Sequence, residues 1–253
     1  MAWLTVRAQR IHYESSGYGD AVLLLPGWAG NIIEFDRLRH ELSAGCRVIA
    51  ADLPGCGRSQ PQPREYSATF YVEDAHTFHA FLDELDVSAV HLVGFSDGGE
   101  VALLMAALEP RRALSVVTWG AAGQVAVPVE GRLDGIENAI DDPIEPLQEL
   151  AAYLAEAYGV DNARAMVRSW GGALRAIIDA GGDISMSRAA DIRCASLLLT
   201  GSEDPVCPPS LVAAMADGIP RGVFREVPGA AHDVHRSHGP LLASMVAEWI
   251  GDH

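Results

Sequence analysis

The sequence contains no lysine, so its 18 basic residues are all arginines. A phosphate-binding loop of the P-loop type requires a lysine after its glycines, and the sequence therefore excludes that kind of nucleotide site. The arginines are outnumbered by 34 acidic residues, which gives a formal net charge of -16. Because so negative a chain is repelled by nucleic acid and by anionic membrane surfaces, we expect neither of them as a partner.

Long apolar runs are missing as well. The chain has no stretch of about 18 apolar residues, the length that crosses a bilayer. Residues 1–10 also lack the apolar run of a secretory signal. We therefore expect the protein to be cytoplasmic.

Cysteine is scarce, and its spacing suggests no structural role. The sequence has no C-x-x-C pair and no spacing typical of metal ligands. Because cytoplasmic thiols are kept reduced, we expect no disulfides. The four cysteines are Cys46, Cys56, Cys194 and Cys207.

The composition is that of an ordinary globular protein. Hydrophobic residues make up 49% of the 253 residues and charged residues 21%. A chain of this length and composition buries a sizeable core, and α/β folds of this size are commonly undivided. We expect a monomer or a weak homo-oligomer built around one core.

Short apolar runs alternate with segments of helical periodicity, which predicts an α/β fold with a mostly parallel sheet of about eight strands flanked by helices. Residues 3–16 alternate apolar and polar side chains before a glycine turn and are expected to form an antiparallel hairpin. The other expected strands are residues 21–25, 47–51, 89–94, 114–119, 196–200 and 223–227. The expected helices are residues 32–42, 69–85, 98–108, 209–217 and 236–250.

The segment 124–190 interrupts this alternation. It has no strand signal, and residues 146–158 and 162–179 carry apolar side chains at helical intervals. We expect a helical cap inserted after the sixth strand, above the carboxyl ends of the strands, where open α/β sheets bind ligands. The core domain would then consist of residues 1–123 and 191–253, with 124–190 as the cap. An extra solvent-facing layer of helices is the alternative.

A candidate nucleophile lies between an expected strand and an expected helix. Residues 94–98 read Gly-Phe-Ser-Asp-Gly and match the G-x-S-x-G nucleophile elbow, in which a serine on a strained turn exposes its hydroxyl. The flanking glycines let the strand and helix approach each other closely. A serine that caps a helix is the alternative interpretation of such a turn.

Ser96 needs a base to take its proton and an acid to orient that base. Asp204 follows the expected strand 196–200, and His232 follows the strand 223–227. The chain order Ser, Asp, His is the order of the α/β-hydrolase fold, and it brings the three residues to one edge of the sheet. Position after a strand favours this pair over the nearby Glu203, Asp233, His235 and His238.

An acyl-transfer site also needs N–H donors for the oxyanion of its tetrahedral intermediate. Residues 26–30, Pro-Gly-Trp-Ala-Gly, directly follow the strand 21–25, and we expect one donor to be the backbone N–H of Trp28. The second is expected from Asp97, the residue after the nucleophile. The alternative is a simple turn with Trp28 as a core aromatic.

Five segments together resemble the α/β-hydrolase superfamily of serine hydrolases and, within it, the valacyclovir hydrolase family of biphenyl hydrolase-like proteins. The resemblance spans nearly the whole chain. Its segments are 23–27, 52–59, 94–99, 119–121 and the pair 204–205 with 232–235. It implies hydrolysis of small carboxylic esters, in particular α-amino acid esters, with Asp97 binding the substrate ammonium group and Val206 lining the substrate pocket.

Physical chemistry gives a separate reason to single out Asp97. A carboxylate beside a forming oxyanion raises the energy of the transition state for a neutral substrate unless a cation compensates it. A substrate ammonium group would supply that charge and would disfavour neutral analogues. The alternative is that Asp97 only complements the positive end of the helix that it begins, which contributes about 0.3 to 1 kcal/mol.

Three other functions remain open at this point. Carbon-carbon bond hydrolysis and cofactor-free perhydrolysis use related triads, and a small-molecule receptor can keep the same pocket without catalysis. The aspartate after the nucleophile argues against the anionic substrates of carbon-carbon hydrolases. His232 and His235 resemble a pair of metal ligands, but they lack a third ligand in sequence, and we expect neither metal nor cofactor.

Overall fold

Eight strands form one sheet in the computed structural model, which describes residues 2–125 and 133–253. Their spatial order is β1-β2-β4-β3-β5-β6-β7-β8. The hairpin of β1 and β2 is antiparallel, β2 is antiparallel to β4, and all the other neighbours are parallel. The predicted α/β class is confirmed. The strands are β1 (Ala2–Val6), β2 (Gln9–Ser16), β3 (Ala21–Leu25), β4 (Arg47–Ala51), β5 (Val90–Phe95), β6 (Ala113–Trp119), β7 (Ala195–Gly201) and β8 (Gly222–Val227).

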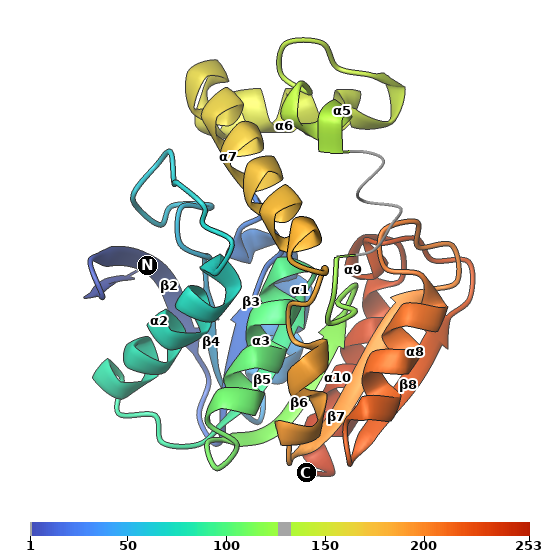
Figure 1. Cartoon of the computed structure of the whole chain (residues 1–253). Coiled ribbons are helices and arrows are strands. Elements are labelled where there is room, and N and C mark those ends of the chain that lie inside the picture. The colour runs from blue at the N-terminus through green and yellow to red at the C-terminus, as the bar shows by residue number, and fades with distance from the viewer. Residues whose placement is uncertain (1, 126–132) are drawn as a thin grey trace.

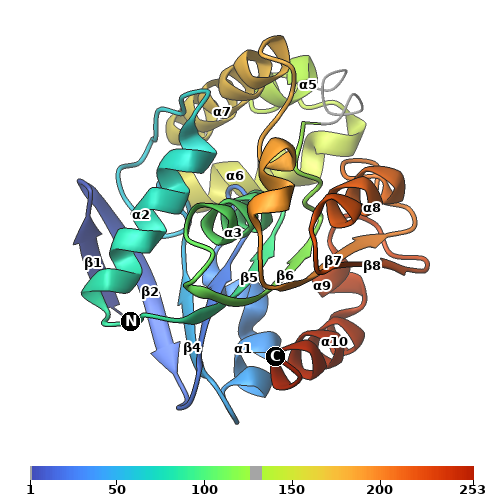
Figure 2. The ribbon, with the colours of Figure 1, turned by 60° about the horizontal axis from the view of Figure 1, so that its bottom comes forward.

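Helices cover both faces of this sheet (Figures 1 and 2). Three of them, α2 (Phe70–Glu84), α3 (Asp97–Leu108) and α8 (Pro209–Gly218), pack on one face. The opposite face is covered by α1 (Asp36–Leu42) and α10 (Gly239–Gly251). Because the central strands are buried on both faces, they are mostly apolar, and β3 is entirely so with Ala-Val-Leu-Leu-Leu.

Two expected helices differ from the prediction in detail. The segment 32–42 begins as the 3-10 helix η1 (Ile32–Phe35) before α1. The segment 236–250 is interrupted, because the short helix α9 (Val234–Ser237) ends before α10 starts. Pro240 lies in the first turn of α10, where its missing N–H costs nothing, whereas a proline in the interior of one long helix would break it.

The described residues between β6 and β7 form several helices joined by turns, with one isolated bridge between Gln124 and Asp183. The helices are α5 (Leu133–Glu137), η2 (Glu145–Leu147), α6 (Gln148–Tyr158), α7 (Val160–Asp179) and η3 (Met186–Asp191). Helices α5 to α7 lie together beyond the carboxyl end of the sheet (Figure 1). Residues 126–132 of the predicted cap lie outside the described residues.

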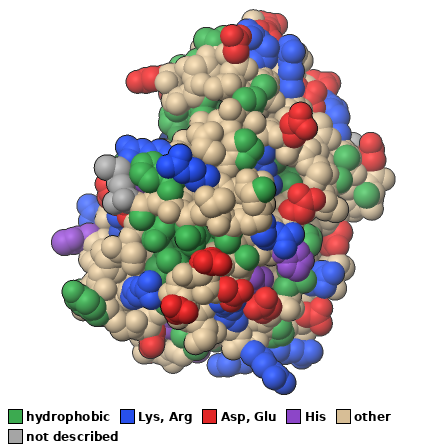
Figure 3. Space-filling view, turned by 90° about the vertical axis from the view of Figure 1, so that its left-hand side faces the viewer, with side chains coloured by type: hydrophobic (Ala, Val, Ile, Leu, Met, Phe, Trp, Pro, Cys, Tyr) green, Lys and Arg blue, Asp and Glu red, His purple; other side chains and the backbone are tan. Residues whose placement is uncertain are grey.

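The surface carries charges of both signs. On the face in Figure 3, acidic and arginine side chains alternate with apolar ones. None of the helices in residues 2–125 and 133–253 combines the length and apolar character that crossing a membrane requires. The four cysteines are free thiols, as expected.

Candidate active site

Ser96 lies at the turn between β5 and α3, as predicted, and its backbone is strained. Its φ of 51° and ψ of -121° fall in a region that residues with a side chain rarely adopt. The turn is held by close packing on both sides. A Cβ atom on Gly94 would lie 2.3 Å from the carbonyl oxygen of Gly98, and one on Gly98 would lie 2.3 Å from that of Pro26. Larger residues at either position would force the strand and helix apart.

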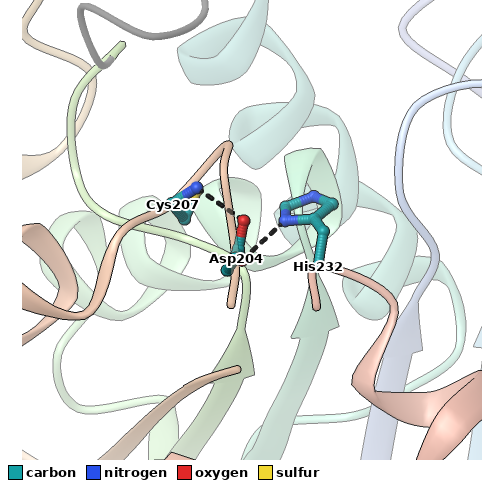
Figure 4. Close-up of side chains that lie close together, drawn as sticks. All are labelled: Asp204, Cys207 and His232. Atoms are coloured by element: carbon teal, nitrogen blue, oxygen red, sulfur yellow. Dashed lines mark hydrogen bonds and ion pairs between the residues drawn. The ribbon is translucent and has the colours of Figure 1, made fainter. Parts of the chain in front are cut away.

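Asp204 and His232 extend from Ser96 as one hydrogen-bonded chain. The His232 Nε2 atom lies 3.1 Å from Ser96 Oγ, and its Nδ1 atom lies 2.8 Å from Asp204 Oδ2. Figure 4 shows the Asp204 carboxylate pointing toward the imidazole ring. The structure thus brings Ser96 together with two residues that lie more than a hundred positions further along the chain, in the arrangement that a general base requires.

The Asp204 carboxylate is fixed by further donors. Its Oδ1 accepts hydrogen bonds from the backbone N–H groups of Val206 and Cys207, at 2.8 and 2.9 Å, and its Oδ2 accepts one from the Thr200 hydroxyl at 3.0 Å. Burial acts to raise the pKa of Asp204. The hydrogen bond from His232, the charge of the imidazole and the two backbone N–H groups together outweigh burial, so that the pKa of Asp204 is lowered. Asp204 therefore stays ionised and orients the imidazole. Val206 contributes to the site through its backbone N–H.

Gly120 makes room for the imidazole ring. It has a φ of 66°, and a Cβ atom here would lie 2.7 Å from His232 Cε1. On another side the ring of Phe95 packs against His232, with ring centroids 5.0 Å apart. Both neighbours restrict His232 to the orientation that faces Ser96.

The loop after β3 passes beside Ser96. A Cβ atom on Gly27 would lie 3.0 Å from the Phe95 ring and 3.3 Å from Ser96 Cβ, so a larger residue here would press on the nucleophile turn. Asp97 begins α3, so its N–H has no partner within the helix. No acceptor among the described residues takes the N–H of Trp28 or of Asp97. These are the two donors expected for an oxyanion.

The Asp97 side chain is buried beside this loop. It is 6% exposed, and its two oxygens accept hydrogen bonds from the Tyr71 hydroxyl at 2.7 Å and from Trp170 Nε1 at 2.9 Å. Burial raises the pKa of Asp97 to about 6, although these two hydrogen bonds and the charge of Arg64 act in the opposite direction. The carboxylate therefore makes direct hydrogen bonds only to neutral donors in the part of the chain that the structure describes.

The competing acids and bases make other contacts. Glu203 is exposed, Asp233 pairs with Arg236 at 3.9 Å, and the His238 Nδ1 atom lies 2.9 Å from the hydroxyl of Ser237. His235 accepts a hydrogen bond from Trp119 Nε1 at 3.1 Å and packs against Phe95.

One group of described residues has the donor types of a metal site, and it does not include His235. Ligand atoms of Asp204, Cys207 and His232 lie within 4.8 Å of one another. These atoms already have hydrogen-bond partners. Asp204 bonds His232 and the Cys207 N–H (Figure 4), and the Cys207 thiol donates to the Gly120 carbonyl at 3.1 Å. This arrangement fits a hydrogen-bonded catalytic triad better than a metal site.

Sequence analysis missed several residues that support the site. Tyr71 and Trp170 bind Asp97 from α2 and α7, and Thr200 binds Asp204. A tyrosine on a helix of mixed polarity carries no local signal of such a role. Trp170 belongs to a Trp-Gly-Gly segment in the insertion, and two glycines within a helix were the available hint.

Comparisons with known proteins identify the family and support the fold. The model of the alpha/beta hydrolase family matches residues 22–244. Human serine hydrolase BPHL is 28% identical over 92% of this chain and 80% of its own length. A 2-hydroxy-6-oxononadienedioate/2-hydroxy-6-oxononatrienedioate hydrolase from Cupriavidus pinatubonensis is 26% identical over 96% of this chain and 91% of its own length. Among solved structures, a thermophilic esterase from Thermogutta terrifontis superimposes with a TM-score of 0.78 at 22% identity, covering 99% of this chain and 98% of that one.

Proposed function

The chain belongs to the alpha/beta hydrolase family, and from this premise we propose that it is a serine hydrolase that cleaves small carboxylic esters through an acyl-enzyme on Ser96. The observation that carries the proposal is the hydrogen-bonded chain from Ser96 through His232 to Asp204. The similarity to serine hydrolase BPHL supports the same chemistry.

In the acylation step, His232 Nε2 takes the proton of the Ser96 hydroxyl as Oγ attacks the ester carbonyl carbon. Asp204 accepts a hydrogen bond from Nδ1 and stabilises the resulting imidazolium. The negative charge on the former carbonyl oxygen is met by the N–H groups of Trp28 and Asp97. When the tetrahedral intermediate collapses, the proton on Nε2 passes to the leaving alkoxide, and an alcohol departs.

Deacylation repeats these steps with water. His232 takes a proton from water, the hydroxide attacks the acyl carbon, and the proton returns to Ser96 Oγ as the carboxylic acid leaves. In both steps His232 transfers the proton, and the only bonds that form and break between heavy atoms are those at the acyl carbon. The proposed reaction therefore requires no cofactor.

We further propose a preference for α-amino acid esters, with Asp97 as the receptor for the ammonium group. Asp97 directly follows the nucleophile, and in this proposal its carboxylate receives the ammonium group on the acyl half of a bound ester. A buried carboxylate with only neutral hydrogen-bond donors around it gains from a cationic partner. Val206, which follows Asp204 closely, is proposed to line the same pocket.

Carbon-carbon bond hydrolysis is the second candidate, because the Cupriavidus pinatubonensis relative is named for it and a 2-hydroxymuconate semialdehyde hydrolase from Pseudomonas is 26% identical over 96% of this chain. Dienoate substrates of that class carry anionic groups. The buried Asp97 carboxylate beside Ser96 would repel them. Ester hydrolysis fits the site better.

A labelling experiment and a substrate panel test the proposal. A fluorophosphonate probe should label the wild-type protein and leave Ser96→Ala unlabelled, because only an activated serine reacts with it. The wild-type protein should hydrolyse amino acid nitrophenyl esters faster than plain acyl esters and leave a ring-cleavage dienoate unchanged. Equal labelling of both proteins would exclude Ser96 as the nucleophile, and turnover of the dienoate alone would favour the second candidate.

The remaining features of the proposal concern the whole protein. We place it in the cytoplasm as a monomer or weak homo-oligomer that acts on a small-molecule ester. Residues 1–123 and 191–253 would form the catalytic core and residues 124–190 the cap. Sedimentation analysis checks the oligomeric state, and limited proteolysis within residues 124–190 that leaves the core intact would support the division.

A further inference from the structure

The loop after β3 packs against the helices inserted between β6 and β7. Ala29 is buried in a small apolar cluster whose other buried members all come from α6 and α7. These members are Leu154, Tyr158, Ala163, Met166 and Val167. Trp28 packs against the same cluster and stacks on Trp170 of α7, with ring centroids 4.3 Å apart and planes inclined by 18°. The conformation of this loop therefore depends on residues outside the catalytic core.

The carbonyl group of Ala29 accepts two hydrogen bonds from side chains of the inserted helices. The donors are two hydroxyl groups of α6, that of Tyr158 at 2.7 Å and that of Tyr153 at 2.9 Å. The Tyr158 hydroxyl also accepts a hydrogen bond from the Gly57 N–H at 2.8 Å. Tyr158 therefore bridges two loops of the core, and it is only 8% exposed.

Ala29 needs such support because its backbone is strained. Its φ of 59° lies in the left-handed region, which costs a residue with a side chain roughly 1 kcal/mol or more. Its own N–H donates to the Cys56 sulfur at 3.3 Å, and a thiol is a weak acceptor. The loop is also flanked by Gly27 and Gly30, which restrict its dihedral angles little. Besides the Gly30 N–H to Gly27 carbonyl bond at 3.1 Å, the two tyrosine hydroxyls thus supply the shortest polar contacts of this loop.

We propose that Tyr158 is a positioning residue for the oxyanion hole. By holding the Ala29 carbonyl, it fixes the loop that aims the Trp28 N–H at the oxygen of the tetrahedral intermediate, so that α6 completes the catalytic geometry. The inference rests on the proposed function. An oxyanion donor is effective only when it is held in place before the charge develops.

The predicted kinetic signature follows from when the charge appears. The substrate carbonyl is neutral in the bound ester and becomes an oxyanion only in the transition state. A loosened donor therefore lowers kcat and leaves KM largely unchanged. A residue that only stabilises the fold would lower the melting temperature without this pattern.

Tyr158→Phe removes one hydroxyl and keeps the ring that packs on Ala29. We expect kcat for a nitrophenyl ester to fall about 10- to 100-fold, less than the roughly 100- to 1000-fold loss when an oxyanion donor itself is removed. A boronic acid, whose tetrahedral adduct mimics the intermediate, should lose affinity by the same factor as kcat/KM, while the product alcohol should inhibit as before. Tyr18→Phe, at a residue that is 91% exposed, is the matched control and should behave as wild type.

Tyr153→Phe removes the second hydroxyl from the same carbonyl and should give the same pattern with a smaller loss, about threefold to tenfold in kcat, because Tyr158 remains. This variant carries the test if Tyr158→Phe does not fold. Unchanged kcat and boronate affinity in the folded variants would overturn the inference and leave the proposed function intact. A wild-type protein that neither reacts with fluorophosphonate nor hydrolyses esters would instead overturn the proposed function.

Discussion

Ser96 adopts its strained backbone because the residues around it determine the turn. Its N–H donates to the Trp119 carbonyl at 2.9 Å, and its own carbonyl accepts the Glu100 N–H at 3.0 Å. These bonds tie the serine both to the neighbouring strand and to the helix that follows. Strain of this kind costs of order 1 to 3 kcal/mol and persists at functional sites where the surroundings impose it.

Asp97 differs in burial and in hydrogen bonding from an ordinary aspartate in the first turn of a helix. Such an aspartate gains little from the helix dipole and is normally solvated, whereas Asp97 is buried and bonded to two side chains. The nearby Arg64 is already bound by Asp74 through two hydrogen bonds, at 2.8 and 2.7 Å. Its charge acts on Asp97 only at a distance. These contacts favour a receptor for a cation over a simple helix cap.

Asp97→Asn tests this role with little change in shape. Trp170 Nε1 can only donate, so the Asn oxygen must face it, and the Asn amino group then donates to the Tyr71 hydroxyl. Loss of a charged hydrogen bond should lower kcat/KM for amino acid esters about 10- to 100-fold. Plain acyl esters should react within about threefold of the wild-type rate. An equal loss for both substrate classes would contradict cation recognition.

The same preference should depend on pH. Because the pKa of Asp97 is raised to about 6, its charge is present above that pH and is lost below it. The substrate ammonium loses its proton at about pH 8 or below. The ratio of kcat/KM for an amino ester to that for a plain ester should therefore rise above pH 6 and fall again near pH 8. Any pH dependence that both substrates share cancels from the ratio. Asp233→Asn, at a half-exposed carboxylate near His232, should leave this profile unchanged.

Helix α3 connects the site to both ends of the inserted segment through Glu100. One oxygen of Glu100 accepts the N–H groups of Ala122 and Gly123, at 2.9 and 2.8 Å, where the chain leaves β6. The other accepts the Ser185 hydroxyl at 2.8 Å, where the chain returns toward β7. A single buried carboxylate therefore joins the two connections of the insertion to the helix that begins at the nucleophile.

Glu100→Gln should change the stability of the protein in a pH-dependent way. Burial raises the pKa of Glu100 to about 7, although Ser185 and the two N–H groups act to lower it. Folding thus favours the protonated form of Glu100. This stabilisation is complete below the pKa of the side chain in the unfolded chain, about 4.3, and it is lost as the pH rises through the pKa of about 7 in the folded protein. Glutamine keeps the neutral shape. The free energy of unfolding of the variant relative to wild type should therefore rise between pH 4.5 and 7, by about 3 kcal/mol at most.

Chemical denaturation at several pH values measures this difference. Glu84→Gln, at an exposed residue at the end of α2, is the matched control and should show no such trend. A difference between Glu100→Gln and wild type that stays constant, or that falls as the pH rises, would show that Glu100 is not held in a protonated form by the fold.

The elements that sequence patterns predicted well are those with a local cause. The strands β3 and β4 were predicted with the correct residues, because burial on both faces requires uninterrupted apolar runs. The turn at Ser96 was equally clear from its two glycines. The supporting contacts were not predictable, because Tyr158 reaches Ala29 across 129 positions and Trp170 reaches Asp97 across 73. Such contacts depend on how the inserted helices dock, and no local periodicity encodes that.

The net charge of -16 produces a negative electrostatic potential around the whole molecule. Acidic residues outnumber arginines by 34 to 18, and on the face in Figure 3 the two kinds alternate. The excess of negative charge therefore belongs to the molecule as a whole. A field of this sign raises the local concentration of cations near the molecule and lowers that of anions. Cationic amino esters would gain from it, and neutral esters would not.

Salt should separate this long-range field from the contact with Asp97. Raising the ionic strength from about 0.01 M to about 1 M shortens the screening length from about 30 Å to about 3 Å, which removes the surface field but affects a buried ion pair much less. We expect kcat/KM for a cationic amino ester to fall by roughly two- to tenfold over this range, while the value for a neutral ester of the same alcohol stays constant. Asp97→Asn should start from a lower value and show nearly the same slope, because it removes one charge of a net -16. A slope that disappears in Asp97→Asn would mean that the attraction of the cation resides in that one carboxylate and that the surface field plays no part.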